Sequence, residues 1–111
     1  MESEKRREAI AAYKERTIIP GIYALRCVAT GECWVGRAPD LSTIQNRLWF
    51  TLRLGSSPHR ALQQAWRQNG AESFSFERVE ELDAEELGFA LDRVMGERHE
   101  YWCEQLAAQR I

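Results

Sequence analysis

The sequence contains no run of about 18 apolar residues, the length that a membrane-spanning helix requires, although 44% of its 111 residues are hydrophobic. Its first residues are mostly charged, and no apolar stretch follows them, so we expect no signal peptide. These two absences predict a cytoplasmic protein with no membrane partner. The length predicts a single domain that buries its own core.

Cysteine and histidine are scarce. There are three cysteines and two histidines, with no Cys-x-x-Cys pair and no histidine at zinc-finger spacing. A structural zinc site is therefore not expected. In the cytosol we expect Cys27, Cys33 and Cys103 to be reduced thiols that pack in the protein. The alternative is a disulfide between Cys27 and Cys33, which flank a short turn.

Positive charge is not in excess, because the formal net charge is −2. The charge is unevenly distributed, however. Residues 21–72 carry six arginines and three acidic residues, a net +3, whereas residues 73–111 carry four arginines and ten acidic residues, a net −6. Any surface that binds phosphate must therefore be local and lie in the middle of the chain. The basic residues of 21–72 are all arginine, a residue type that suits bidentate phosphate contacts. The alternative is that they are ordinary solvated surface arginines.

A β-hairpin is predicted near the start of the chain. Residues 21–28 are rich in residues that favour strands, and 29–32 form a turn that contains glycine. Residues 33–36 then form the returning strand.

Helical periodicity dominates the rest. Apolar residues recur at helical spacing in 43–54 and 59–68, residues 74–79 alternate as a strand, and an apolar stripe runs through 84–108. We expect an α+β fold with a small, three-stranded, mainly antiparallel sheet flanked by helices. A helical extension at 1–19 would precede the main domain at 20–111.

Several short motifs occur in a fixed order along this pattern. The sequence resembles the GIY-YIG nuclease family through Gly21-Ile22-Tyr23, Trp34-Val35-Gly36 after a ten-residue gap, Arg47 on a helix, Leu62-Gln63 with Trp66, and then Asn69-Gly70 and Phe74. The resemblance covers roughly residues 20 to 106. It implies a three-stranded antiparallel sheet packed by helices, and metal-dependent hydrolysis of phosphodiester bonds.

The resemblance assigns roles to two residues first. Tyr23 would lie near the nucleophilic water, the alternative being a ring that only fills the sheet face. Arg47 would contact the scissile phosphate and stabilise developing charge, the alternative being an exposed helix arginine. The resemblance adds two further catalytic candidates, Trp34 and His59. Trp34 replaces the family's second tyrosine and cannot exchange a proton. His59 precedes the second helix.

The metal ligand is left open between three residues. The resemblance implies one Mg2+ or Mn2+ ion held by a glutamate of the last helix. Alignment on Trp102 and Leu106 places His99 at that position. Helical geometry favours Glu97, beside Val94, as the first choice, with His99 second and Glu100 third. The alternative for all three residues is an ordinary charged helix surface.

The predicted function is that of a small nuclease acting on DNA, with Arg37, Arg53 and Arg60 as additional DNA-binding residues. No separate DNA-binding domain is visible, so specificity would come from the structure of the DNA, from a homodimer or from a partner protein. The alternative is a module that keeps the fold, has weak or no catalysis, and binds nucleic acid or a protein.

Overall fold

A computed structural model of the chain describes residues 18–111. Most of the helical extension predicted at 1–19 lies outside the described residues. The chain begins its sheet with β1 (Gly21–Cys27) and β2 (Cys33–Ala38), which pair in antiparallel register. Gly31 lies in the connecting turn with φ +79°, a left-handed conformation that glycine adopts without steric cost. The predicted hairpin is confirmed.

The sheet has four strands in the order β3-β1-β2-β4. Strand β3 (Phe74–Glu81) pairs antiparallel with β1, as expected. The prediction of three strands was wrong in number, because β4 (Gln109–Arg110) pairs in parallel with β2 at Trp34 and Val35. The chain reverses direction at Ala107, which has φ 49°, and so returns along the edge of β2. A two-residue strand has no periodicity by which the sequence could predict it.

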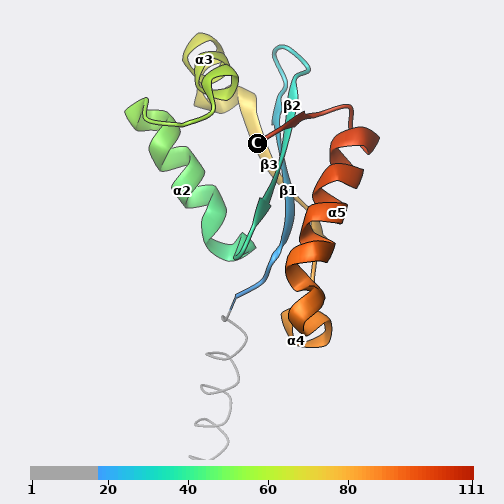
Figure 1. Cartoon of the computed structure of the whole chain (residues 1–111). Helices are drawn as coiled ribbons and strands as arrows, with labels where there is room; N and C mark the ends of the chain where they lie inside the picture. The colour runs from blue at the N-terminus through green and yellow to red at the C-terminus, as the bar shows by residue number, and fades with distance from the viewer. Residues whose placement is uncertain (1–17) are drawn as a thin grey trace, which may run out of the picture.

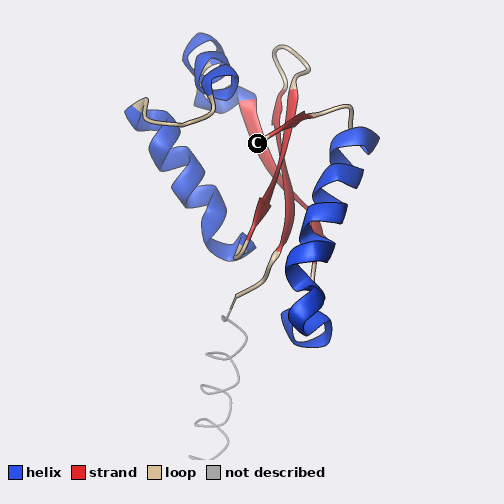
Figure 2. Ribbon diagram, viewed as in Figure 1, coloured by secondary structure: helices blue, strands red, loops and turns tan. Residues whose placement is uncertain are grey.

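Two helices follow β2 and cover one face of the sheet (Figures 1 and 2). The first, α2 (Leu41–Leu54), is capped by the Asp40 side chain, which accepts a hydrogen bond from the backbone of Ser42. It ends at Gly55. The second, α3 (Arg60–Asn69), is followed by a short 3-10 turn that leads into β3. Both helices match the predicted ranges to within two residues.

The C-terminal helical segment covers the opposite face of the sheet (Figure 1). It comprises α4 (Ala84–Leu87), a 3-10 turn at Gly88–Ala90 and α5 (Leu91–Gln105). The single helix predicted over 84–108 is therefore interrupted. Gly88 has φ 51° and ψ −122°, which is incompatible with continuation of an α-helix. The apolar stripe continues across the break, so periodicity alone does not reveal it.

The sheet divides the core into two clusters because successive side chains of a strand point to opposite faces. On the α2/α3 face the largest buried side chains are Tyr23, Leu25, Trp34, Leu41, Leu48, Leu52, Leu62, Trp66 and Phe74. On the α5 face the cluster comprises Ile22, Ala24 and Val35, with Trp102, Cys103 and Leu106 packed against it. The three cysteines are free thiols. Within residues 18–111, no helix is long and apolar enough to cross a membrane.

Candidate functional site

Tyr23 lies at the centre of the hairpin and faces the α2/α3 layer. Its cross-strand partner in β2 is Gly36. A Cβ atom at residue 36 would overlap the hydroxyl oxygen and the adjoining ring carbon of Tyr23. The phenol therefore lies across the backbone of Gly36, in space that only glycine leaves open. In this way the two motifs at Gly21-Ile22-Tyr23 and Trp34-Val35-Gly36 form one structural unit.

The surroundings of Tyr23 determine its protonation state. The ring is 4% exposed and stacks on Phe76 with a centroid distance of 5.5 Å. Burial raises the pKa of Tyr23 to about 12, because the phenolate would lose its hydration. At neutral pH the side chain is a neutral phenol. It can donate one hydrogen bond and accept others, but it is not a general base by itself.

Trp34 is a core residue. Its side chain is 1% exposed and stacks against Phe74 at a centroid distance of 6.0 Å. Its indole nitrogen is buried and has no hydrogen-bond partner among residues 18–111. The structure therefore places Trp34 in the hydrophobic core on the α2/α3 face of the sheet, in the same cluster as Tyr23.

The other predicted residues of the α2/α3 layer lie at the surface. Arg47 and Arg53 project from α2 into solvent, and neither forms an ion pair with a residue in the described range. Arg47 directly precedes the buried Leu48, so it lies about 100° around the helix from that residue, on the exposed side of α2. His59 is half-buried at the N-cap of α3, and its imidazole does not cap that helix.

Arg37 belongs to the other face of the sheet. It follows Gly36 in β2, and its guanidinium lies over Gly96 of α5, 3.4 Å from the position that a Cβ would occupy there. Strand β4 pairs with β2 only at Trp34 and Val35. Within the described part of the chain, the segment of β2 from Gly36 onward is thus an open edge between α2 and α5.

His99 faces β2 from α5. It is 2% exposed, and its Nε2 lies 2.9 Å from the carbonyl oxygen of Val35. The other ring nitrogen, Nδ1, is buried without a partner in the region that the structure describes. Burial lowers the pKa of His99, and the charges of Arg110 and Arg37 lower it further, against the hydrogen bond to Val35. The neutral imidazole donates from Nε2 and is enclosed by protein.

Glu97 and Glu100 lie on the outer part of α5. Glu97 is 60% exposed and pairs with Arg93, its Oε1 lying 3.0 Å from a guanidinium nitrogen. At about 100° per residue, Glu97 points nearly opposite His99 and Met95, the buried residues of the helix. Helical geometry placed Glu97 beside Val94, and the structure turns its carboxylate to solvent. Glu100 is one turn beyond Gly96, on the flank of α5 nearer to Arg37.

The chain aligns with two structures of the catalytic domain of the intron homing endonuclease I-TevI, one of them a point mutant. For the mutant the TM-score is 0.68 at 24% identity over 80% of this chain and 84% of that one. For the other structure, the TM-score is 0.70 at 23% identity over 83% of this chain and 97% of that one.

The chain has the GIY-YIG fold. This confirms the fold that the sequence motifs implied. No protein-family model matches the sequence. No curated protein matches it either. The likeness is therefore one of fold.

The described residues of this GIY-YIG fold contain no ready-made cluster of metal-ligating side chains. Among residues 18–111, no three side chains of the types His, Cys, Asp and Glu gather in a way that could hold a metal. Mg2+ is commonly held by one or two carboxylates, with water and substrate phosphates completing its shell. The exposed carboxylates of Glu97 and Glu100 fit that kind of site by donor type. His99 does not, because Mg2+ prefers oxygen and the ring is already bonded to Val35.

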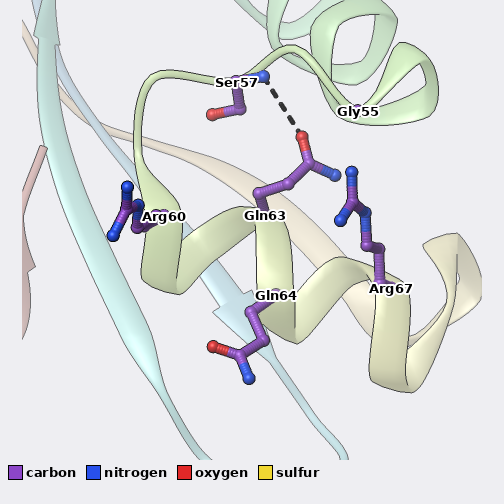
Figure 3. A pocket seen from close by; sticks show the side chains of 6 residues that line it. All are labelled: Gly55, Ser57, Arg60, Gln63, Gln64 and Arg67. Carbon is purple, nitrogen blue, oxygen red and sulfur yellow. Dashed lines mark hydrogen bonds between the residues drawn. The ribbon is translucent and has the colours of Figure 1, made fainter.

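Sequence reasoning missed most of a polar pocket at the α2–α3 turn of this fold (Figure 3). Its volume is about 400 Å3. It is lined by Gly55, Ser57, Arg60, Gln63, Gln64 and Arg67. Only Arg60 was predicted to take part in binding. The signal in the sequence was the spacing of Arg60, Gln63, Gln64 and Arg67, which places four polar side chains along one side of a helix.

Proposed function

We propose that this chain is a nuclease that hydrolyses DNA phosphodiester bonds with the help of a divalent ion, Mg2+ or Mn2+. The observation that carries the proposal is the Tyr23 phenol lying across Gly36, in a fold shared with the catalytic domain of a homing endonuclease. A hydroxyl held at a fixed point on a rigid sheet is suited to orienting a water molecule or a phosphate oxygen.

Tyr23 would act as a neutral hydrogen-bonding group. Because its pKa is about 12, the phenol keeps its proton at neutral pH and positions the attacking water by hydrogen bonds. Arg47 would supply positive charge to the phosphate. It lies on α2, which covers the same face of the sheet as Tyr23, and it has no carboxylate partner within residues 18–111. Its five N–H donors are therefore available to phosphate oxygens.

A carboxylate of α5 would hold the ion. Glu97 is the candidate from the sequence, and Glu100 lies on the flank of α5 nearer to the open edge of β2. When bound, the ion would offset charge on the phosphate and favour deprotonation of a nearby water. For Glu97 to bind it, the carboxylate must give up or share its ion pair with Arg93.

DNA is the proposed substrate. The excess of arginine over acidic residues in 21–72 supplies local positive charge on a chain whose net charge is −2. Arg37 and Arg53 would contact phosphates beside the scissile one. Since the net charge does not favour DNA, a homodimer or a partner protein would contribute to specificity.

The test is a cleavage assay with purified protein and branched, nicked and plasmid DNA, in Mg2+ or Mn2+. We expect Arg47→Ala to lower the rate about 100-fold or more, as loss of a charge-stabilising donor does. Tyr23→Phe, Glu97→Gln and Glu100→Gln separate the remaining roles. Arg26→Ala is the matched control, since Arg26 is paired with Glu77 on the α5 face of the sheet. Absence of cleavage with every metal and substrate would refute the proposal.

A second candidate is a GIY-YIG module that binds nucleic acid without cutting it. Two observations favour it: His99, at the position aligned with the family's glutamate, is enclosed against Val35, and Glu97 points away from the sheet. This candidate predicts DNA binding that does not depend on a divalent ion, with no cleavage in the same assay. Cleavage that Arg47→Ala abolishes excludes it.

A further inference from the structure

The pocket at the α2–α3 turn presents hydrogen-bond donors and no acid. Its lining side chains are two arginines, two glutamines and one serine, and no carboxylate contributes to its wall. Figure 3 shows Arg60 and Arg67 projecting from the two ends of α3, with Gln63 and Gln64 between them. Neither arginine is ion-paired with any residue from 18 to 111. A pocket of this composition is complementary to an anion.

The loop that forms the opposite wall is held in place by a buried side chain. Gln63 is 7% exposed; its Oε1 accepts a hydrogen bond from the backbone of Ser57 at 3.1 Å. Its Nε2 donates to the carbonyl oxygen of Leu52 at 3.0 Å. Both polar ends of Gln63 are thus used to fix the turn against α3. The pocket is formed before any ligand arrives, which lowers the entropic cost of binding.

Gly55 makes room for one of the arginines. A Cβ at residue 55 would lie 2.8 Å from a terminal guanidinium nitrogen of Arg67. Glycine also satisfies the backbone, which has φ +74° at the end of α2. The turn therefore admits the Arg67 guanidinium close to the main chain, on the rim of the pocket.

The start of α3 adds positive potential at the same place. No side chain caps α3, no acidic residue lies in its first turn, and Arg60 is its first residue. By contrast, Asp40 caps α2 and Asp83 caps α4. A cation at the positive end of a helix is unfavourable unless an anion is near. A phosphate in the pocket would compensate both Arg60 and the helix end.

We propose that this pocket binds backbone phosphates of DNA away from the bond that is cut, with Arg60 and Arg67 as its two cationic contacts. The seven-residue spacing separates the two residues by about 10 Å along the helix axis, so each arginine contacts a different phosphate of the same duplex. This inference rests on the proposed function, because it takes DNA as the ligand. It assigns to Arg67, Gln64 and Ser57 a role in holding the substrate.

The experiment measures binding of a fluorescent 30-base-pair duplex over a series of NaCl concentrations, in EDTA so that no cleavage occurs. The variants are Arg60→Gln, Arg67→Gln and the double variant. Arg26→Gln, which also removes one positive charge, is the control. The logarithm of the binding constant falls with that of salt concentration by about 0.9 for each phosphate contact. We expect each single variant to reduce that slope by about one, the double variant by about two, and the control to leave it unchanged.

Two uncharged substitutions separate a contact in the pocket from general electrostatics. Gln64→Ala removes a lining amide, and we expect about a fivefold loss of affinity with the salt slope unchanged. Gln68→Ala, on the same helix outside the lining, should bind as the wild type does. The inference is overturned if Arg60→Gln and Arg67→Gln behave like Arg26→Gln, or if the wild type does not bind the duplex.

The outcome is separable from that of the proposed function. Cleavage by the wild type together with unchanged binding by the pocket variants keeps the nuclease and rejects the pocket. If the pocket variants reduce the salt slope but the wild type does not cleave DNA, phosphate binding by the pocket is supported and nuclease activity is rejected. Because Arg60 and Arg67 are exposed, we expect their variants to fold, and thermal unfolding verifies this.

Discussion

The phenol of Tyr23 lies across Gly36, its partner on the neighbouring strand. The contact requires that residue 36 have no side chain. It joins the two sequence motifs of the hairpin physically, and it makes the position of the hydroxyl depend on the glycine.

Gly36→Ala should destabilise the fold by about 1–3 kcal/mol, because the added methyl overlaps the Tyr23 ring and forces it to move. The free energy of unfolding in urea measures this. Gly96→Ala is the matched control: it lies in α5 and meets only the movable end of Arg37, so it should be neutral or stabilising by up to about 1 kcal/mol. Equal stability of Gly36→Ala and the wild type would contradict the proposed contact.

Stability should fall at alkaline pH because of Tyr23. Burial raises its pKa from 10.0 to about 12, so between these values the unfolded chain has lost a proton that the folded chain retains. Ionisation therefore favours unfolding, by about 2–3 kcal/mol at most. Urea titrations at pH 9 and pH 12 should show this loss in the wild type and a smaller one in Tyr23→Phe. The control Tyr101→Phe, at an exposed position, should keep the full loss.

Stability should also fall in mild acid because of His99. Its pKa is lowered by burial, so below about pH 6.5 the unfolded chain binds a proton that the folded chain resists. The charged groups that face this ring, Arg110 and Arg37, act in the same direction. Unfolding free energies at pH 7.5 and pH 5.0 should differ more for the wild type than for His99→Gln. His59→Gln serves as the control, and a wild-type difference no larger than that of His99→Gln would refute the prediction.

Glu80 joins β3 to α5 through one oxygen atom. Its Oε1 accepts hydrogen bonds from Arg98 Nε at 2.7 Å and from Trp102 Nε1 at 2.8 Å. Burial alone would raise the pKa of Glu80, but these two hydrogen bonds and the charge of Arg98 outweigh it and lower the pKa. The stability that Glu80 contributes is therefore fully present at pH values above the usual glutamate pKa. It is lost as the pH falls through the lowered pKa of Glu80.

We expect Glu80→Ala to cost about 1–3 kcal/mol, because it leaves the indole N–H and the guanidinium without their acceptor. Glu81→Ala removes a neighbouring carboxylate whose pair with Arg78 is exposed, and should cost less than about 0.5 kcal/mol. Chemical denaturation at pH 7 distinguishes the two variants. Similar losses for both would show that the Glu80 contact contributes no more than a surface ion pair.

Much of the fold could be predicted from the sequence because its signals are local. Alternation and turn residues identified β1, β2 and β3, and helical spacing identified α2 and α3. The helix break at Gly88 and the strand β4 were not predicted. The apolar stripe continues across the glycine, and β4 depends on the chain reversing at Ala107 and meeting the edge of β2, which is a contact between segments far apart in sequence.

The candidate site was less predictable because burial and direction are tertiary properties. The motif Gly21-Ile22-Tyr23 identified Tyr23, but only packing shows that the phenol is buried and that its pKa is about 12. The spacing on the last helix did not decide which of Glu97, His99 and Glu100 would bind the metal. The structure buries His99 and turns Glu97 to solvent, because the sheet lies on the side of α5 that carries His99 and Met95.

The sequence predicted a hairpin with glycine in its second motif, followed by two helices, a strand and a C-terminal helical segment. It did so because residue preferences and periodicity act within a few neighbouring residues. Packing between segments places Tyr23 against Gly36, and it brings Arg60 and Arg67 into one pocket with Gly55. Those relationships depend on distances between separate segments, which are set when the sheet and helices pack together.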